Sequence, residues 1–316
     1  MVKTPQITVV IPTRDRSEQL TRTLDELQLQ SSILGDALEV VVVDDGSRVP
    51  VRAELRRFLN LGPRGDWLRC IRQPPSGPAA ARNLGIAAAR APVVLFIGDD
   101  ILPLPGFLQA HLRAHTETYL DENVAVLGLA DLAPDLAQTP FVRWWKIWNF
   151  RYGSLLSGER DPDPSFFYTN NLSLKREFLL EHGLFDEDFE YPAYEDAELG
   201  FRLARNGLRL VFVPGAEAHH MHPMSLESAC RRMVTRGRAY DLFVAKTGVR
   251  GISKLWLWLG SGPWMRPSLV RYLYPLARWG QTRVRLRLVY ILVLMYHFQI
   301  GRGRVPMLGG PERSVV

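Results

Sequence analysis

Short apolar runs alternate with longer amphipathic segments along the first hundred residues of the chain. The runs are rich in valine and isoleucine, which is typical of buried strands, and they occupy residues 6–11, 39–43, 68–71 and 93–97. Between them leucine or alanine recurs at helical spacing, and helices are expected from Ser17, over about 52–59 and over about 79–90. This alternation predicts a doubly wound α/β sheet.

The pattern is less regular after residue 100. Helices are expected over 107–117, 175–182 and 194–206, and strands are expected over 124–129 and 209–213, the last one stopping at Pro214. Four prolines interrupt residues 131–165, so this stretch is expected to be irregular around a cluster of aromatic residues. The chain shows no internal repeat.

The composition is that of a globular protein. The chain has 316 residues, 47% of them hydrophobic and 23% charged, which is enough for one large domain or two modest ones. Two cysteines, Cys70 and Cys230, cannot form a disulfide framework, and no secretory signal core precedes Pro12. A cytoplasmic location is therefore expected, with contact at the inner face of the cell membrane as an additional hypothesis.

Positive charge is concentrated at the C-terminal end. From Lys246 onward twelve residues are Lys or Arg and only Glu312 is acidic, although the whole chain has a net charge of +6. The tryptophans of this tail are Trp256, Trp258, Trp264 and Trp279. Residues 288–296 are apolar without interruption, but a membrane-spanning helix needs about 20 such residues. The stretch is expected to be either a packed core helix or an interfacial element on a membrane surface.

Polar clusters follow three of the predicted strands. They are Thr13 to Asp15, Asp44 to Ser47, and Asp99 to Asp100. Ligands of doubly wound sheets bind beyond the carboxyl ends of the strands, so these clusters are expected to share one edge of the sheet. The alternative is that Asp and Ser act there only as turn and helix-capping residues.

Asp99 and Asp100 are adjacent carboxylates at the end of a buried strand. Like charges resist burial together, and a divalent cation such as Mn²⁺ or Mg²⁺ would offset their repulsion. Residues 219–222 read His-His-Met-His, and in an extended segment His220 and His222 would point to the same face. One of them could complete a metal site begun by Asp100. A strand followed by a polar turn, and a solvated histidine-rich loop, are the alternative interpretations.

Other candidate groups lie at the starts of helices. Gly77 precedes the helical turn that leads to Arg82, a combination suited to a diphosphate, although Arg82 could also be a solvated helix position. Glu195 and Asp196 open another helix; one could be a general base, although an acidic pair also complements the helix dipole. No GxGxxG, GxxxxGK[ST] or GxSxG motif is present, which disfavours the common dinucleotide folds, phosphate loops and α/β-hydrolase elbows.

Seven short motifs occur along the chain in a fixed order. They read PTRDR, VVDDGS, GPAAARNLG, LFIGDD, NNLSL, YEDAELGFRL and HHMH. Together they make the chain similar to the family-2 glycosyltransferases with the GT-A fold, over about residues 5–240. The resemblance implies a GT-A-like, doubly wound mixed sheet flanked by helices. It also implies a glycosyltransferase domain over 1–245, with a nucleotide-binding half (1–120) and an acceptor half (121–245), before a basic, Trp-rich helical tail (246–316).

The resemblance implies binding roles for individual residues. Those expected to bind the nucleotide sugar are Pro12, Thr13, Arg14, Asp15, Asp44, Asp45, Gly77, Arg82 and Asp99. Among them, Asp45 would hydrogen-bond the base, which is uracil in many relatives, and Asp99 would lie near the ribose. The residues expected beside the donor sugar or the acceptor are Asn170 and Asn171. Those expected to bind the metal are Asp100, His220 and His222. Gly98 is a departure, because relatives usually carry an aspartate at this position.

The resemblance further implies an inverting transfer. Asp196, with Glu195 as its neighbour, would take the proton of an acceptor hydroxyl, and the metal and Arg82 would stabilise the leaving diphosphate. The expected donor is a UDP-sugar, and the expected acceptor is a glycan or a lipid-linked molecule in cell-envelope polysaccharide assembly. A nucleic-acid partner is not expected, because no base-stacking motif is present. The alternatives are a sugar nucleotidyltransferase and a non-catalytic module that binds a glycan or a membrane.

Overall fold

The computed structural model describes residues 4–59, 67–136, 138–158, 161–250, 267–284 and 286–306. The chain forms two compact units. The first unit comprises Met1–Ala133, Ser154–Glu190 and Glu195–His222, and the second comprises Pro134–Gly153, Tyr191–Tyr194 and Pro223–Val316. These units divide the chain at points other than the boundary at residue 245 expected above, which stays a prediction.

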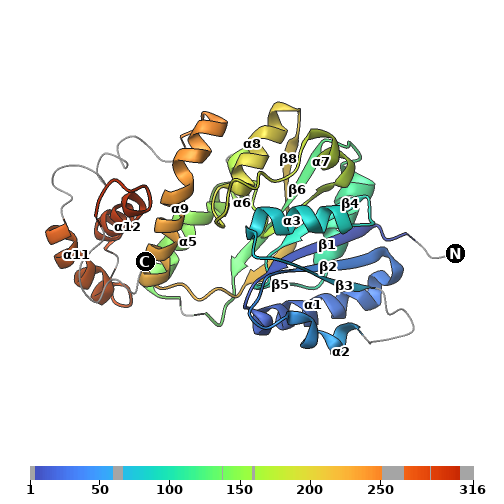
Figure 1. Cartoon of the computed structure of the whole chain (residues 1–316), viewed down its shortest axis with the longest axis horizontal. Coiled ribbons are helices and arrows are strands. Elements are labelled where there is room, and N and C mark those ends of the chain that lie inside the picture. Colours follow the sequence, from blue (N-terminus) through green and yellow to red (C-terminus); the bar gives the residue numbers. More distant parts are fainter. Residues whose placement is uncertain are drawn as a thin grey trace. The chain divides into compact units, whose positions relative to one another are not determined.

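A mixed sheet is the framework of the first unit (Figure 1). Its strands are β1 (Ile7–Thr13), β2 (Leu38–Asp45), β3 (Leu68–Gln73), β4 (Val93–Ile97), β5 (Ile101–Pro103), β6 (Val124–Leu132), β7 (Asn171–Lys175) and β8 (Arg209–His220). They lie in the order β3-β2-β1-β4-β7-β6-β8-β5. The first four are parallel, β7 is antiparallel to β4 and β6, and β8 is parallel to β6 but antiparallel to β5. The prediction of a mixed α/β sheet is confirmed.

Helices cover both faces of the parallel strands. Those of the first unit are α1 (Ser17–Leu34), α2 (Arg56–Leu59), α3 (Gly77–Ala88), α4 (Phe107–Arg113), α7 (Arg176–His182) and α8 (Glu195–Arg205). Short 3₁₀ or π turns occupy Gly35–Ala37, Val51–Ala53, Ala114–Thr118 and Pro164–Phe166. In β2, Val40 and Val42 belong to a core cluster with leucines of α1, whereas Val41 and Val43 cluster with Ala81 of α3. Figure 1 accordingly shows α1 and α2 across the sheet from α3.

β8 continues beyond the point where the sequence predicted its end. Residues 214–216 form a bulge, because the register with β6 shifts between Gly128 and Leu129. The bulge accommodates Pro214, which has no backbone N–H to donate to the ladder, and pairing then resumes as far as His220. The prediction of a strand stopping at Pro214 was therefore wrong. The extension carries the histidine motif to the edge of the sheet.

The second unit is helical. Its helices are α5 (Pro140–Phe150), α9 (Leu226–Thr247), α11 (Pro267–Gly280) and α12 (Arg287–Gly301), and α6 (Tyr152–Leu156) spans the junction between the units in the sequence. Residues 131–165 were predicted to be irregular, and this prediction was wrong for Pro140–Phe150, which form α5. The Thr139 hydroxyl caps this helix by accepting the Val142 N–H, and Pro140 takes the first helical position, where proline favours a helix start.

The apolar stretch 288–296 lies in α12 and is buried along most of its length. Gly237 of α9 and Gly301 of α12 allow a close helix crossing, because a Cβ on Gly237 would collide with the Phe298 carbonyl. The stretch is thus a packed helix, and the interfacial alternative for these residues is corrected. Within the described ranges, no helix is long and apolar enough to cross a membrane. The tail residues outside the described ranges include Trp256, Trp258, Trp264 and Glu312.

Candidate active site

Asp99 and Asp100 follow β4 after one residue, Gly98, and are almost completely buried. Thr13, at the end of the adjacent strand β1, donates its hydroxyl proton to Asp99 Oδ2 at 2.8 Å. Thr23 of α1 donates to the backbone carbonyl of Asp99 at 2.9 Å. Parallel pairing of β1 with β4 therefore brings two of the three polar clusters into contact.

Arg16 is a site residue that sequence reasoning missed. Its guanidinium lies 2.9 Å from Asp99 Oδ1 and 2.6 Å from Asp100 Oδ2, so one arginine pairs with both adjacent carboxylates. Arg14, which the resemblance indicated instead, is exposed. The available signal for Arg16 was its place in the PTRDR motif, where the turn after β1 leads into the N-terminus of α1.

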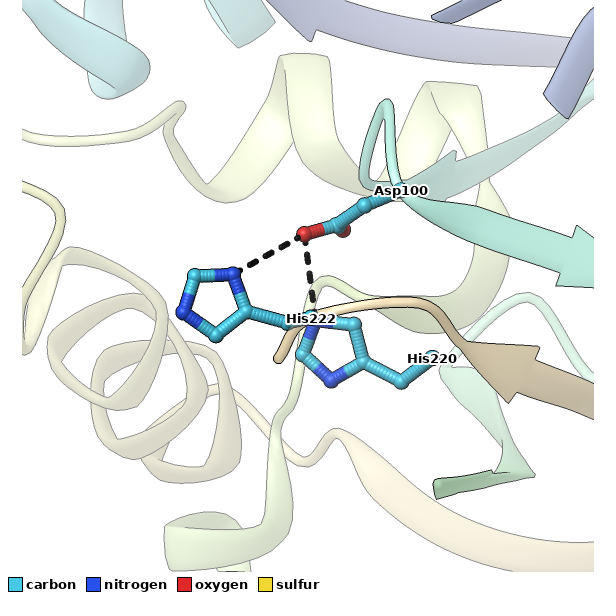
Figure 2. A group of neighbouring side chains, drawn as sticks. All are labelled: Asp100, His220 and His222. Carbon is cyan, nitrogen blue, oxygen red and sulfur yellow. Dashed lines mark ion pairs between the residues drawn. The ribbon is translucent and has the colours of Figure 1, made fainter. Parts of the chain in front are cut away.

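Two histidines approach the same carboxylate from the end of β8 (Figure 2). His220 Nε2 lies 3.3 Å and His222 Nδ1 lies 3.6 Å from Asp100 Oδ2. The backbone fixes this approach, because Ile101 of β5 pairs with His220 and the Met221 N–H donates to the Asp100 carbonyl at 2.8 Å. The antiparallel β5–β8 contact therefore positions residues that are far apart in the sequence.

Asp100, His220 and His222 could together hold a metal ion. Each offers one ligand atom, and these atoms lie within 4.8 Å of one another. A carboxylate oxygen with two imidazole nitrogens suits a divalent transition ion such as Mn²⁺ better than Mg²⁺, which prefers oxygen ligands. The donor set therefore fits the kind of cofactor that the resemblance implies.

The two adjacent aspartates differ in their electrostatics. Burial raises the pKa of Asp99 to about 6, even though the charge of Arg16 opposes this shift. Burial also acts to raise the pKa of Asp100, but the charge of His220 and hydrogen bonds with both histidines hold that pKa well below its usual value. Asp100 thus stays anionic at neutral pH, which is the form that binds a cation.

Asp44 and Asp45 end β2, and their carboxylates organise the loops that follow. Asp44 is buried and accepts the Ser47 N–H at 2.8 Å. Asp45 accepts the N–H groups of Ser76 and Gly77, at 2.8 and 3.0 Å, where α3 begins. A protein carboxylate therefore occupies the helix N-terminus that the sequence suggested for a diphosphate. The nucleotide contacts of these residues stay predictions.

The turn after β1 is joined to the turn after β2. The Asp15 N–H donates to the Ser47 hydroxyl oxygen at 2.9 Å, and the Asp15 carboxylate accepts the Arg48 N–H at 2.8 Å. Pro12 takes part in the β1–β2 pairing. The first and second polar clusters are therefore in contact, as expected for carboxyl ends of parallel strands. The nucleotide-binding roles of residues 12–15 stay predictions.

Arg82 of α3 and Glu195 of α8 form a buried ion pair with 2.9 Å between Nη1 and Oε1. Burial and the charge of Asp196 raise the pKa of Glu195 to about 7, while Arg82 opposes the shift. Asp196 is less buried than Glu195 and is the more accessible carboxylate of the two. Tyr194, directly before them, has a φ of 70°, a costly conformation for a bulky residue that is often found at functional sites.

Asn171 is completely buried. Its amide nitrogen donates to the carbonyls of Leu129 and Ala216 at 3.1 and 2.8 Å, and its Oδ1 lies 2.8 Å from His111 Nε2. The side chain is therefore used inside the protein, and its contact with a sugar stays a prediction. Asn170 is partly exposed, and its Oδ1 has no hydrogen-bond partner among the described residues.

Comparison with known proteins agrees with this architecture. The family model of Glycosyl transferase family 2 matches residues 8–183. Chondroitin synthase of Escherichia coli is 28% identical over 271 residues, which cover 76% of this chain and 38% of that protein. The pre-mycofactocin glycosyltransferase of Mycobacterium tuberculosis (strain H37Rv) is 30% identical over 251 residues, covering 77% of this chain and 48% of that protein. The chain thus matches less than half of the length of either relative.

A solved structure shows the same fold. The mannosyltransferase of Pyrobaculum calidifontis, in complex with GDP-Man and Mn²⁺, superposes with a TM-score of 0.64 at 19% identity and covers 95% of this chain and 87% of that one. This likeness confirms the expected GT-A-like arrangement of sheet and helices. Because the family match extends over more than half of its residues, the chain belongs to glycosyl transferase family 2.

Proposed function

We propose that this transferase is inverting and moves a sugar from a nucleotide-diphosphate sugar, with UDP-sugars favoured, to a hydroxyl of a glycan or lipid-linked acceptor. The observation that carries the proposal is the approach of His220 and His222 to one carboxylate oxygen of Asp100 at the end of the sheet. The chondroitin synthase among the relatives supports a glycan acceptor. A metal-dependent donor site is supported by the GDP-Man and Mn²⁺ in the mannosyltransferase neighbour.

The metal ligands in this proposal are Asp100, His220 and His222. A bound Mn²⁺ would supply positive charge against the negative charge that develops on the diphosphate as its bond to the sugar breaks. Asp99 keeps Thr13 in place at the end of β1, next to the predicted nucleotide pocket. In this proposal Asn170 contacts the donor sugar: the residue is partly exposed, and its buried amide oxygen has no hydrogen-bond partner among the described residues.

Asp196 is proposed as the general base. It takes the proton of the acceptor hydroxyl while the hydroxyl oxygen attacks the anomeric carbon from the face opposite the diphosphate. The new glycosidic bond forms as the bond to the phosphate oxygen breaks, so the configuration inverts without a covalent enzyme intermediate. Glu195 keeps its ion pair with Arg82 and thereby fixes the first turn of α8, which carries Asp196.

The donor class can be tested by a thermal-shift screen of UDP- and GDP-sugars, each with and without Mn²⁺. The expected result is stabilisation by one nucleotide class that depends on Mn²⁺ and is lost in Asp100→Ala. Equal stabilisation of Asp100→Ala and the unchanged protein would contradict the metal assignment. If GDP-sugars alone stabilise the chain, the UDP preference is wrong and the transferase class is retained.

The base can be tested with Asp196→Asn, with Asp188→Asn as a control on an exposed neighbouring carboxylate. Asp196→Asn is expected to lower the release of nucleoside diphosphate from the donor by about 100-fold or more, because proton transfer is lost. Binding of nucleotide with Mn²⁺ should change little, as measured by calorimetry. Unchanged turnover in Asp196→Asn would refute its role as base. In a separate assay, release of pyrophosphate from a nucleoside triphosphate and a sugar 1-phosphate, with no release of nucleoside diphosphate from a nucleotide sugar, would identify a sugar nucleotidyltransferase.

A further inference from the structure

α11 leaves an apolar stripe open to solvent. The stripe residues, with the exposed fraction of each, are Leu269 (38%), Tyr272 (79%), Leu276 (43%) and Trp279 (51%). Their spacing of three, four and three residues places them along one side of the helix. The other side buries Val270, Tyr274 and Ala277 within the second unit. The helix is therefore apolar on two sides, and the second unit covers only one of them.

Arginines accompany this stripe, and acids are missing from the same segment. Arg271 and Arg278 are exposed on α11, and the guanidinium of Arg283 lies 5.4 Å from the ring centroid of Trp279. Between Lys246 and Pro311 the sequence contains no Asp or Glu. Arg278 lies 3.4 Å from Glu227 of α9. Positive charge therefore dominates the surroundings of the stripe.

We infer that α11 docks on an anionic lipid bilayer, with the stripe at the boundary between headgroups and acyl chains. A helix that lies on a membrane needs an apolar side to bury and basic residues that pair with lipid phosphates. Tyrosine and tryptophan are the side chains that favour this boundary, because each has an apolar ring and a polar group. The stripe and its arginines supply both elements.

Charge and shape favour a bilayer over an acidic polymer. A nucleic acid or an acidic glycan would pair with Arg271 and Arg278, but it would provide no apolar phase for Leu269, Tyr272 and Leu276. None of the described helices spans a membrane, so this contact would be peripheral. The inference is independent of the proposed transfer chemistry, because α11 carries none of the residues assigned to catalysis.

The test is co-sedimentation of the full chain with vesicles of phosphatidylcholine alone and of phosphatidylcholine mixed with phosphatidylglycerol. We expect pelleting with the anionic vesicles, reduced by high salt. The double variant Tyr272→Ser/Trp279→Ser should lower the partition coefficient about tenfold or more. The matched control Leu29→Ser/Leu120→Ser, which removes two exposed leucines of the first unit, should bind as the unchanged protein does. Circular dichroism checks that each variant is folded.

Two outcomes would overturn the inference. One is a full chain that does not pellet with anionic vesicles. The other is a Tyr272→Ser/Trp279→Ser variant that pellets as well as the unchanged protein, since binding would then depend on charge alone. Retention of this variant on heparin together with full vesicle binding would identify an acidic polymer as the better partner. Donor turnover should be the same in the stripe variant as in the unchanged protein, whichever outcome is found.

Discussion

Arg16 and Gly98 explain how two adjacent buried carboxylates are tolerated. Arg16 contacts both Asp99 and Asp100, so neither charge is buried without a partner. Gly98 leaves room for the second carboxylate, because a Cβ at this position would lie 2.9 Å from Asp100 Oδ1. A side chain at residue 98 would therefore force Asp100 to shift away from Arg16, His220 or both. This crowding is a physical reason for a glycine at position 98.

Arg16→Met is expected to destabilise the metal-free protein and to strengthen Mn²⁺ binding. Loss of the guanidinium removes the cation that the two buried carboxylates share, which costs about 1–2 kcal/mol after allowance for the partial exposure of Arg16. The same change frees Asp100 Oδ2 for a metal ion. Chemical denaturation measures the first effect and titration calorimetry the second, with Arg14→Met as an exposed control. Weaker Mn²⁺ binding in Arg16→Met would contradict a competition between arginine and metal.

At the scale of elements, β7 and α4 are joined by a buried polar network. Asn171 and Ser173 alternate with leucines along β7, so both polar side chains point to the face that holds His111. The Asn171 amide nitrogen donates to two backbone carbonyls, so the Asn171 amide oxygen must be the acceptor for the N–H at His111 Nε2. The other ring nitrogen of His111, Nδ1, then accepts from the Ser173 hydroxyl. The Ser173 hydroxyl then accepts from His115 Nε2. This assignment requires a neutral His111, because its Nδ1 accepts a hydrogen bond.

His115→Leu is expected to weaken the acid sensitivity of the fold. Burial lowers the pKa of His115 to about 3 and that of His111 to about 4, whereas an unfolded histidine titrates near 6.5. Between these values the unfolded chain binds protons that the folded chain does not, so stability falls as pH falls. Removing His115 should reduce the loss of unfolding free energy between pH 7 and pH 5 by about 2 kcal/mol.

Urea unfolding of the unchanged protein and the variant at both pH values measures this difference. His182→Leu is the matched control, because His182 is partly exposed and lies outside the network. The same pH dependence in His115→Leu and the unchanged protein would show that His115 is not held neutral in the folded chain.

At the scale of the whole molecule, charge is divided unevenly. The excess of +11 from Lys246 onward leaves −5 for the preceding residues, out of a net charge of +6. The sheet of the first unit concentrates part of that negative charge at one end of its strands, where Asp44 and Asp45 end β2 and Asp99 and Asp100 follow β4, the two strands on either side of β1. Only the folded chain brings this end of the strands to the end of β8, so a cation bound there should favour folding.

Mn²⁺ is therefore expected to raise the Tm of the full chain in a concentration-dependent manner. A ligand that binds only the folded state stabilises it by about 2.7 kcal/mol at a concentration of 100 times its Kd. His222→Ala should lose most of the Tm increase, because one of three ligands is removed. His219→Ala changes a histidine that lies next to His220 but is not one of the proposed ligands, and this variant should keep the Tm increase. Differential scanning fluorimetry measures these Tm values. An equal Tm increase with Mn²⁺ in His222→Ala and His219→Ala would contradict the proposed metal site.

The sequence by itself determined the parallel strands and the helices between them, and it singled out Asp100, His220 and Glu195 as candidate residues. The spacing of apolar residues and the order of motifs can both be seen along the chain without knowledge of the fold. The tertiary structure alone decided which of these groups meet. Arg16 reaches two aspartates more than 80 residues away because β1 pairs with β4, and the histidines arrive because a bulge lets β8 run past Pro214. Such pairings depend on strand order and register, which no local pattern of side chains encodes.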